Sequence, residues 1–475
     1  MLTLRNHKND VQRIKYVVAD ILAVLLSWFL FFLFRRVEIE STFIQEIQLF
    51  SPIYNFEKLL LGIPVYWLFV FWLSGYYNRP FLKSRLEEFL QTFVSVLFGS
   101  IGLFFILLLD DPVVNYTDYY LSFSVLFLIY FFIIYLFRYT LTRISTFNIH
   151  HRISGFNTLI IGTGERALQI YEELRDQKVS TGELVRGFIS ADGCEVKVCG
   201  EDILGTLNDL DEVIRQHSIE EVIVALDGED KNLFYDILNR LFSYQVEVKM
   251  IPRLYDFLIG GVRLNTIYGA PLVNLLDVRM SECAKNMKRL FDIVASALAL
   301  LLTSPLLVIV SICVKLSSPG SVFYKQERIG YLGEAFNIYK FRTMYSNSEG
   351  ETPKLSSKDD ARVTKIGRIL RKYRIDEIPQ FFNVLRGDMS IVGPRPERAF
   401  FEKQIRERAP YYALVHKVRP GITSWGMVKF GYADSVDKMV ERLNYDIIYL
   451  ENMSISVDLK IMIYTVRTVL TGQGV

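Results

Sequence analysis

The chain has 475 residues, a net charge of only +2 and an apolar fraction of 51%. This length predicts two or three domains. The small net charge neither favours nor excludes nucleic acid as a partner, so any electrostatic argument must be local, and no nucleic-acid partner is predicted. The four cysteines form no Cys-x-x-Cys pair, which predicts neither a disulfide framework nor a zinc site and fits a reducing compartment.

Long, aromatic-rich apolar runs near the N-terminus predict a membrane protein. A helix needs about 20 apolar residues to cross the hydrocarbon core of a bilayer. The alternative, buried helices of a soluble protein, leaves too little polar chain to cover such runs. Because further spans follow the first one, we expect no cleavable signal peptide. The four runs are 16–34, 59–77, 89–109 and 119–137.

The basic residues around these runs predict the orientation of a four-helix bundle. Cytoplasmic loops of membrane proteins are enriched in lysine and arginine. Ten basic residues flank the runs on the side that holds both ends of the bundle, and three lie on the opposite side. The chain after the fourth run is therefore expected in the cytoplasm. The ten are Arg5, Lys8, Arg13, Lys15, Arg79, Lys83, Arg85, Arg138, Arg143 and Arg152, and the three are Arg35, Arg36 and Lys58.

Residues 151–280 are predicted to form a Rossmann-like α/β domain with a parallel sheet. Strands alternate with helices along this stretch, which is typical of such folds. A strand, a glycine turn and a helix are expected from 157 to 174, further strands at 185–190, 220–225 and 246–251, and helices near 207–216 and 232–244.

The glycine turn of this region matches the dinucleotide fingerprint at Gly162, Gly164 and Ala167, where glycines let a pyrophosphate approach a helix N-terminus. The acidic residue that binds ribose usually follows about 20 residues on, whereas Asp192 lies farther along. Two interpretations stay open. The region binds a nucleotide, or it is a regulatory or oligomerising domain whose glycines only tighten the turn. No Tyr-x-x-x-Lys pair for hydride transfer stands beside it.

A fifth apolar run, 293–314, carries Ser304-Pro305 at its middle. Proline removes a helix hydrogen bond and clashes with the preceding turn, and the run is flanked by basic residues, among them Lys285 and Lys315. We therefore favour a re-entrant hairpin that enters and leaves on the cytoplasmic face, with the Ser304 hydroxyl bonding locally to the broken backbone. A kinked fifth span, which would place the C-terminal part outside, is the alternative.

An adjacent acidic pair, Asp376 and Glu377, lies within the arginine-rich segment 362–397. The planar guanidinium matches phosphate oxygens bidentately, and a carboxylate among cations stays ionised and can serve as nucleophile, base or metal ligand. The pattern therefore predicts a site for an anionic, phosphate-rich substrate. Pro379 is expected to fix the first turn of a helix, placing the pair at its N-terminus. The alternative is a solvated basic face.

The C-terminal 185 or so residues contain several distinctive motifs in order: "KRLFDIVASALALLLTSPLLVIVSICVKLSSPGSVFYKQERIG", "FNIYKFRTM", "DEIPQFFNVLRGDMSIVGPRPE" and "RPGITSW". This wording resembles the bacterial sugar transferases, the monotopic phosphoglycosyl transferases that act on polyprenyl phosphate. The whole layout resembles the long members of that family, which begin capsule, exopolysaccharide or O-antigen synthesis.

The resemblance implies an α/β catalytic domain with a re-entrant membrane segment at about 290–316, facing the cytoplasm at the bacterial inner membrane. It also implies a reaction: a sugar 1-phosphate moves from a UDP-sugar to undecaprenyl phosphate, giving undecaprenyl-diphosphate sugar and UMP. By the same resemblance Asp376 is the nucleophile that forms a covalent phosphosugar intermediate. Glu377 is its companion, both acids hold the required Mg2+, and Ser304-Pro305 is the bend.

Further basic residues of the motifs are expected to contact substrate phosphates: Lys340, Arg342, Arg374, Arg395 and Arg419. A strand edge is the alternative for the first two, and a structural role for the last. Arginines between 362 and 374 are too numerous for all to be catalytic, and some are expected to face lipid headgroups.

Two departures from the family pattern are visible. Ser321 stands where a second proline is common, and Thr-Ser-Trp-Gly-Met at 423–427 replaces the commoner Thr-Gly-Trp-Ala-Gln. The second weakens any assignment of the sugar, for which the resemblance implies glucose or galactose 1-phosphate, with an N-acetylated sugar as the alternative.

Taken together, the sequence predicts a bundle at 1–150, a Rossmann-like domain at 151–280 and a catalytic domain at 281–475. Its partners would be a UDP-sugar, undecaprenyl phosphate and the lipid bilayer, and a homodimer is compatible with the sequence. Two rivals remain. One is an inactive, nucleotide-sensing membrane regulator of polysaccharide synthesis. The other is an NAD-linked sugar-modifying enzyme.

Overall fold

The fold was analysed in a computed structural model of the chain. The structure describes residues 4–35, 37, 53–78, 81, 83–107, 116–191, 198, 202–228, 230–242, 244, 246–251, 272–275, 280–345, 360–431 and 433–471. Asp192, the distant acid after the glycine turn, lies outside these residues.

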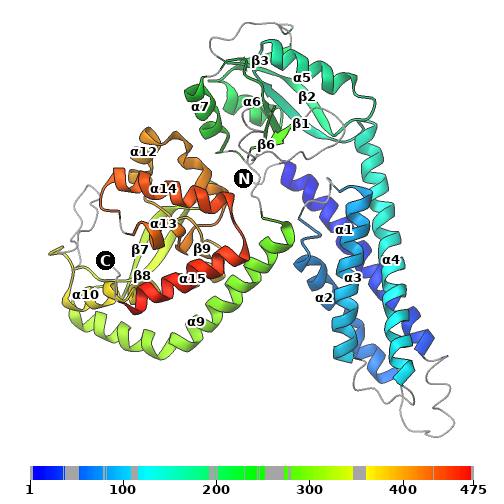
Figure 1. Cartoon of the computed structure of the whole chain (residues 1–475), viewed down its shortest axis with the longest axis horizontal. Coiled ribbons are helices and arrows are strands. Elements are labelled where there is room, and N and C mark those ends of the chain that lie inside the picture. The colour runs from blue at the N-terminus through cyan, green and yellow to red at the C-terminus, as the bar shows by residue number, and fades with distance from the viewer. Residues whose placement is uncertain are drawn as a thin grey trace. The chain divides into compact units, whose positions relative to one another are not determined.

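The N-terminal region contains four described helices that pack as a bundle (Figure 1): α1 (Leu4–Phe34), α2 (Ile53–Leu73), α3 (Arg85–Leu107) and α4 (Tyr116–His150). By length and composition α1, α3 and α4 could each cross a membrane, whereas the apolar helix identified within α2, Leu61–Leu73, is shorter. Large apolar side chains, among them Phe98 and Phe132, are exposed on the outside of the bundle, as expected where lipid replaces water. The chain is a membrane protein, as predicted.

Helix α4 extends well beyond the apolar run at 119–137. The apolar run ends at residue 137, and Arg138 and Arg143, which follow it, lie in the same helix because α4 continues to His150. Arg138 is fully buried, with its Nε 2.8 Å from Asp20 Oδ1 and its Nη2 2.9 Å from Oδ2. A carboxylate from α1 thus replaces water as the partner of this buried guanidinium.

A second buried carboxylate belongs to the same polar network of the bundle. Glu88 of α3 accepts a hydrogen bond of 2.6 Å from the Tyr76 hydroxyl and one of 3.0 Å from Thr142 Oγ1 of α4. The Tyr77 hydroxyl donates to Asp20 Oδ2 at 2.7 Å. These bonds join the turn after α2 to α1, α3 and α4.

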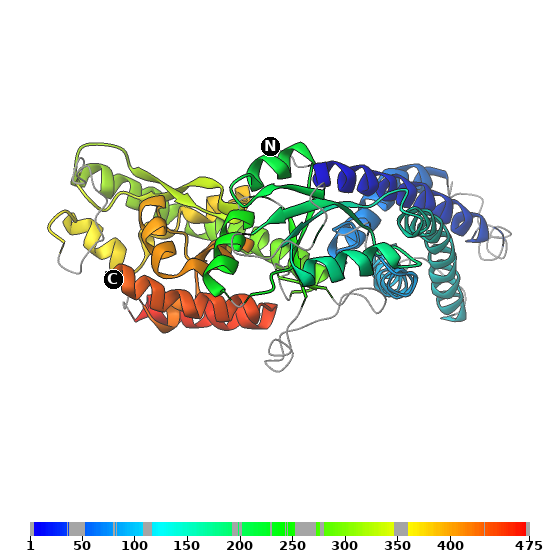
Figure 2. The same ribbon diagram turned by 90° about the horizontal axis from the view of Figure 1, so that it is seen from above.

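The middle region is a six-stranded sheet in the order β3-β2-β1-β4-β5-β6, seen from a second direction in Figure 2. The pairs β2–β3 and β4–β5 are parallel and β5–β6 is antiparallel. The predicted strands and helices are present, and the short strands β3 and β6 were not predicted. The elements are β1 (Phe156–Ile161), α5 (Glu165–Asp176), β2 (Glu183–Ser190), β3 (Ile203–Thr206), α6 (Leu210–Gln216), β4 (Glu221–Val224), α7 (Lys231–Phe242), β5 (Glu247–Met250) and β6 (Val273–Asn274).

The C-terminal region begins with a long helix and continues as short strands and helices around one apolar core. Its strands form an antiparallel pair, β7–β8, and a parallel pair, β9–β10. The elements are α9 (Glu282–Ser317), β7 (Phe323–Ile329), β8 (Ala335–Phe341), α10 (Lys365–Lys372), α11 (Gln380–Arg386), β9 (Ser390–Val392), α12 (Ala399–Arg408), β10 (Gly421–Thr423), α13 (Trp425–Lys429), α14 (Val436–Glu451) and α15 (Ile455–Leu470).

Helix α9 contains the fifth apolar run. It is helical throughout its 36 residues with Pro305 inside it, and Figure 1 shows that it is bent, as proline in a helix interior causes. Ser304 Oγ donates to the Leu301 carbonyl at 2.7 Å. A hairpin with a broken backbone at this point is not confirmed, because one helix runs through it. By length and composition α9 could cross a membrane. Several of its leucines, among them Leu302 and Leu316, are exposed.

Candidate active site

The acidic pair lies in a single tight turn between α10 and α11. Ile375–Glu377 form one turn of 3-10 helix, and Arg374 before it adopts the left-handed backbone conformation with φ 52°. Pro379 directly precedes the seven residues of α11. Asp376 and Glu377 therefore lie just before a helix N-terminus, as predicted, and each is only 8% exposed.

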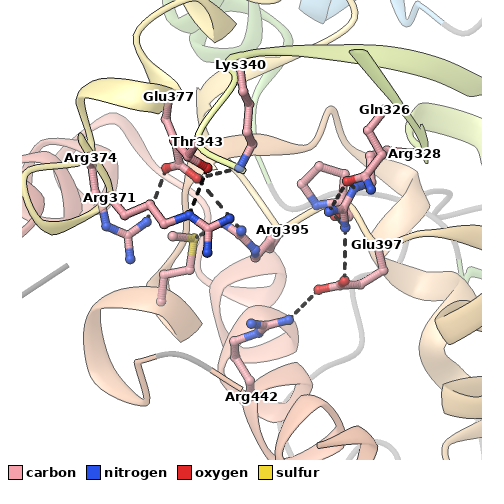
Figure 3. A network of polar contacts seen from close by, with 12 residues as sticks. Gln326, Arg328, Lys340, Thr343, Arg371, Arg374, Glu377, Arg395, Glu397 and Arg442 are labelled. Carbon is pink, nitrogen blue, oxygen red and sulfur yellow. Dashed lines mark hydrogen bonds and ion pairs between the residues drawn. The ribbon is translucent and has the colours of Figure 1, made fainter. Parts of the chain in front are cut away.

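Glu377 is held by three basic side chains from three separate places in the chain (Figure 3). Lys340 Nζ of β8 lies 2.7 Å from its Oε1, and Arg374 Nη1 lies 3.2 Å from its Oε2. Arg395 Nη2 lies 3.8 Å from Oε1. Three of the five predicted phosphate-binding residues thus converge on one carboxylate.

Asp376 differs from its neighbour. Among the described residues, no side chain hydrogen bonds to its carboxylate, although the charges of Lys340, Arg371 and Arg374 act on it. Burial and the adjacent Glu377 raise the pKa of Asp376, and the three cations partly oppose this. Asp376 is therefore the less constrained and more basic of the two acids.

The pKa of Glu377 moves the other way. Burial would raise it, but Lys340, Arg374 and Arg395 outweigh burial and hold the pKa well below its usual range. Burial in turn lowers the pKa of Lys340, and Glu377 opposes that shift. The first proton to leave the pair therefore comes from Glu377, and Asp376 ionises at higher pH.

The segment that carries Arg395 is fixed by a second buried carboxylate, Glu397 (Figure 3). Its two oxygens lie 3.3 Å from Arg328 Nη1 and 2.5 Å from Arg442 Nη2. Arg328 also donates to the Pro396 carbonyl at 3.1 Å. Two prolines and this ion network leave the backbone of Arg395 little freedom, so its guanidinium is directed at Glu377.

Two glycines bring the motifs of β9 and β10 together. β10 pairs with β9 in parallel, and a Cβ on Gly421 would lie 2.1 Å from the backbone nitrogen of Gly393. Only glycine permits such a close backbone approach. On α14, Asp446 accepts a hydrogen bond from the Gly426 nitrogen at 3.1 Å, and burial raises its pKa to about 6.

Arg371 is a site residue that the sequence argument did not single out. It lies on α10, its Nε donates to Thr343 Oγ1 at 2.9 Å, and its charge acts on Asp376. A Cβ on Gly367 would lie 2.1 Å from the Thr343 carbonyl, so this glycine lets α10 approach the Phe-Arg-Thr segment. The position of Arg371, shortly before the acidic pair in the sequence, could have indicated its role. The neighbouring arginines gave no reason to choose it over the others.

Two predicted phosphate-binding residues make backbone contacts instead. Arg342 is buried, and its guanidinium donates to the carbonyls of Pro319 at 2.9 Å and Ser318 at 2.7 Å, beyond the C-terminus of α9. Arg419 Nε donates to the Gly387 carbonyl at 2.9 Å. In this arrangement both cations fix neighbouring backbone and neither contacts the acidic pair.

The oxygen chemistry of the pair suits a hard cation. Mg2+ is usually held by one or two carboxylates together with substrate phosphates, and Asp376 and Glu377 supply two. Within the part of the chain that the structure describes, no group of three or more His, Cys, Asp or Glu side chains could hold a metal ion.

Comparison with known proteins shows which family the chain resembles. Residues 283–472 match the bacterial sugar transferase family, and residues 73–252 match a CoA-binding domain family. A UDP-glucose:undecaprenyl-phosphate glucose-1-phosphate transferase from Caulobacter vibrioides is 42% identical over 220 residues, which cover 45% of this chain and 82% of that protein. The chain belongs to the bacterial sugar transferase family.

Other members of the family share a smaller part of their length with the chain. A UDP-N-acetylgalactosamine-undecaprenyl-phosphate N-acetylgalactosaminephosphotransferase from Aeromonas hydrophila is 41% identical over 50% of this chain and 55% of that protein. A UDP-glucose:undecaprenyl-phosphate glucose-1-phosphate transferase from Escherichia coli K12 is 38% identical over 56% of this chain and 58% of that protein. The chain thus matches little more than half the length of these two relatives, and their names give different sugars.

Proposed function

We propose that the chain transfers a sugar 1-phosphate from a UDP-sugar to undecaprenyl phosphate, with release of UMP. The observation that carries this proposal is that two adjacent buried acids have different surroundings. Glu377 is held by three cations, whereas Asp376 has no hydrogen-bond partner among the described side chains. The names of the relatives support the choice of substrates.

In the first step an oxygen of Asp376 attacks the phosphorus that carries the sugar. The bond from this phosphorus to the oxygen of UMP breaks, and UMP leaves with the electron pair. In the second step a phosphate oxygen of undecaprenyl phosphate attacks the same phosphorus, and the bond to Asp376 breaks. Splitting the transfer in this way means that the two anionic substrates never have to react directly with each other.

The basic residues act on different carboxylates. Lys340, Arg374 and Arg395 keep Glu377 ionised and fix the turn, while Arg371 lies where its charge favours the ionised form of Asp376. The same cations would neutralise charge that develops on phosphoryl oxygens, commonly the largest catalytic contribution. Arg342 and Arg419 contribute by fixing the backbone at the end of α9 and after α11.

We assign Mg2+ to the acidic pair, with Asp376 and Glu377 as its protein ligands and substrate phosphates completing its coordination. When bound, Mg2+ supplies positive charge to the phosphoryl oxygens. The two carboxylates are a suitable but small ligand set, which predicts weak binding in the absence of substrate.

We propose that the active site faces the cytoplasm at the inner membrane, where a soluble nucleotide sugar and a lipid phosphate can meet. The excess of basic residues at the cytoplasmic ends of the bundle supports this orientation. Helix α9, which is bent and contains Pro305, would then enter and leave the bilayer on the same face. The product would begin the synthesis of a polysaccharide such as a capsule, exopolysaccharide or O-antigen.

The test is a panel of UDP-sugars offered with undecaprenyl phosphate to the purified full-length chain, read as UMP release. We expect release with at least one UDP-sugar and a covalent phosphosugar on the protein when the lipid is omitted. Asp376→Asn should abolish both the release and the adduct. Turnover by that variant at the native rate would refute the assignment of the nucleophile, and no UMP release with any donor would favour the inactive regulator.

A further inference from the structure

The glycine turn of the middle region lies where Rossmann folds bind nucleotides. In the strand order β3-β2-β1-β4-β5-β6 the direction of the order reverses between β1 and β4. Ligands of open α/β sheets bind at this reversal, outside the carboxyl ends of the strands. Gly162 follows β1 directly, and Asp227 follows β4 within three residues. Both therefore lie at the edge of the sheet that a dinucleotide would occupy.

In this chain a side chain already occupies the turn. The carboxylate of Asp227 accepts a hydrogen bond of 3.0 Å from the backbone nitrogen of Arg166, in the first turn of α5. A Cβ built on Gly164 would lie 1.6 Å from Asp227 Oδ2. The carboxylate thus lies against the backbone of the second glycine, where the pyrophosphate of a dinucleotide would approach.

Each small residue of the fingerprint has an internal reason for its size. Gly162 has φ +124° and its Cβ would lie 2.2 Å from the Ala225 carbonyl, so the turn between neighbouring strands requires glycine there. Gly164 gives room to Asp227, and Ala167 is fully buried. The motif is therefore explained without a nucleotide.

Electrostatics point the same way. The N-terminus of a helix attracts one negative group, and the carboxylate of Asp227 already provides it. A pyrophosphate entering this turn would meet a like charge and would have to displace the hydrogen bond to Arg166.

We propose that Asp227 is the built-in anion of the glycine turn, and that the middle region does not bind the pyrophosphate of a dinucleotide or of coenzyme A there. The region keeps the architecture of a dinucleotide-binding fold with its phosphate position filled by its own carboxylate. The match to a CoA-binding domain family then describes the fold of this region and not a ligand.

A mutant cycle on the full-length chain tests the link between the two residues. Gly164→Ala should push the carboxylate out of the turn, and Asp227→Ala removes it, so either change exposes the Arg166 amide. We expect amide hydrogen exchange in the peptide containing Arg166 to become about fivefold faster in each variant, as for loss of a helix cap. The double variant should be no faster than either single one.

Asp230→Ala is the matched control. Asp230 lies on the same loop but caps α7 instead, accepting from the backbone nitrogens of Asn232 at 2.9 Å and Leu233 at 3.3 Å. Asp230→Ala should leave amide exchange at Arg166 unchanged. In combination with Gly164→Ala, its effect on exchange in α7 and the effect of Gly164→Ala on exchange at Arg166 should be independent. Independent, additive effects of Gly164→Ala and Asp227→Ala on the Arg166 amide would overturn the proposal.

Calorimetric titration with NAD+ and with coenzyme A provides the second test, since neither is a donor or acceptor in the proposed reaction. The intact chain should show no saturable binding of either compound up to about 1 mM, which is weaker than cofactor sites require. Saturable binding that Gly164→Ala abolishes would overturn the proposal, because it would place a pyrophosphate in the turn.

Discussion

Lys340 Nζ lies 2.7 Å from Glu377 Oε1, and this ion pair joins strand β8 to the turn that carries both acids. Lys340 and Glu377 are 37 residues apart in the sequence. The pair keeps Glu377 ionised, and the charge of Lys340 also lowers the pKa of Asp376 against the effects of burial and of Glu377. One lysine thus influences the protonation of both carboxylates.

Replacement of Lys340 should change the pH dependence of transfer. The pKa of Asp376 is already above its ordinary value, and activity requires the ionised form, so the rate should rise with pH through this pKa. Lys340→Met removes a charge that lowers the pKa, and the acidic limb of kcat/KM should therefore move to higher pH. The exposed Lys325→Met on β7 is the control. An acidic limb that does not move would contradict this role.

Glu377→Gln should lower kcat by about 100-fold or more, a size typical of positioned acid and base groups. Three cations would lose the anion that they surround, and the proposed Mg2+ site would lose a ligand. The concentration of Mg2+ for half-maximal UMP release should therefore rise. A variant with native rate and native Mg2+ dependence would remove Glu377 from the mechanism.

Glu397→Gln should destabilise the C-terminal region and misplace Arg395. Arg328 and Arg442 would be left without a buried anion, and breaking a buried ion pair costs about 3–5 kcal/mol. We expect a lower unfolding temperature and, in the folded fraction, a raised KM for the UDP-sugar. The exposed Glu334→Gln serves as the control. Native stability of Glu397→Gln would show that the network is dispensable.

The buried pair Asp20–Arg138 should matter to the bundle through its charge balance. Asp20→Asn leaves the guanidinium of Arg138 uncompensated and should cost about 3–5 kcal/mol, whereas the double variant Asp20→Leu, Arg138→Met should recover most of that loss. Heating each variant in detergent and then measuring the fraction that stays folded by gel filtration gives the stability of Asp20→Asn and of the double variant. If the double variant is as unstable as the sum of Asp20→Leu and Arg138→Met measured singly, the pair is not the reason for the burial of either residue.

Labelling of single cysteines tests the orientation. In a variant whose native cysteines are replaced by alanine, Lys372→Cys on α10 should react with an impermeant maleimide only after the inner membrane is opened. Tyr116→Cys, at the exposed start of α4, should react in spheroplasts with an intact membrane. Reaction of the α10 position from the outside would place the acidic pair out of reach of a cytoplasmic UDP-sugar.

Local patterns were sufficient for most elements. The glycine turn with its strand and helix, the alternating strands of the middle region and the acidic pair before α11 all depend on residues close in sequence. The burial of Arg138 could not be predicted in this way, because it depends on Asp20, which pairs with Arg138 from 118 positions away. The proline in α9 predicted a bend. It did not show that the helix continues through the bend, because that depends on the hydrogen bonds that remain around Pro305.

The sequence by itself determined which groups are available: apolar helices for a bilayer, and two adjacent acids in a segment rich in guanidinium groups. Only the tertiary structure decided which basic side chain contacts which carboxylate. Lys340 and Arg342 are two residues apart, yet one contacts Glu377 and the other the backbone carbonyls after α9. The reason is that ion pairs form between groups that folding brings together from distant motifs, and in a buried site that pairing separates the pKa values of two neighbouring carboxylates.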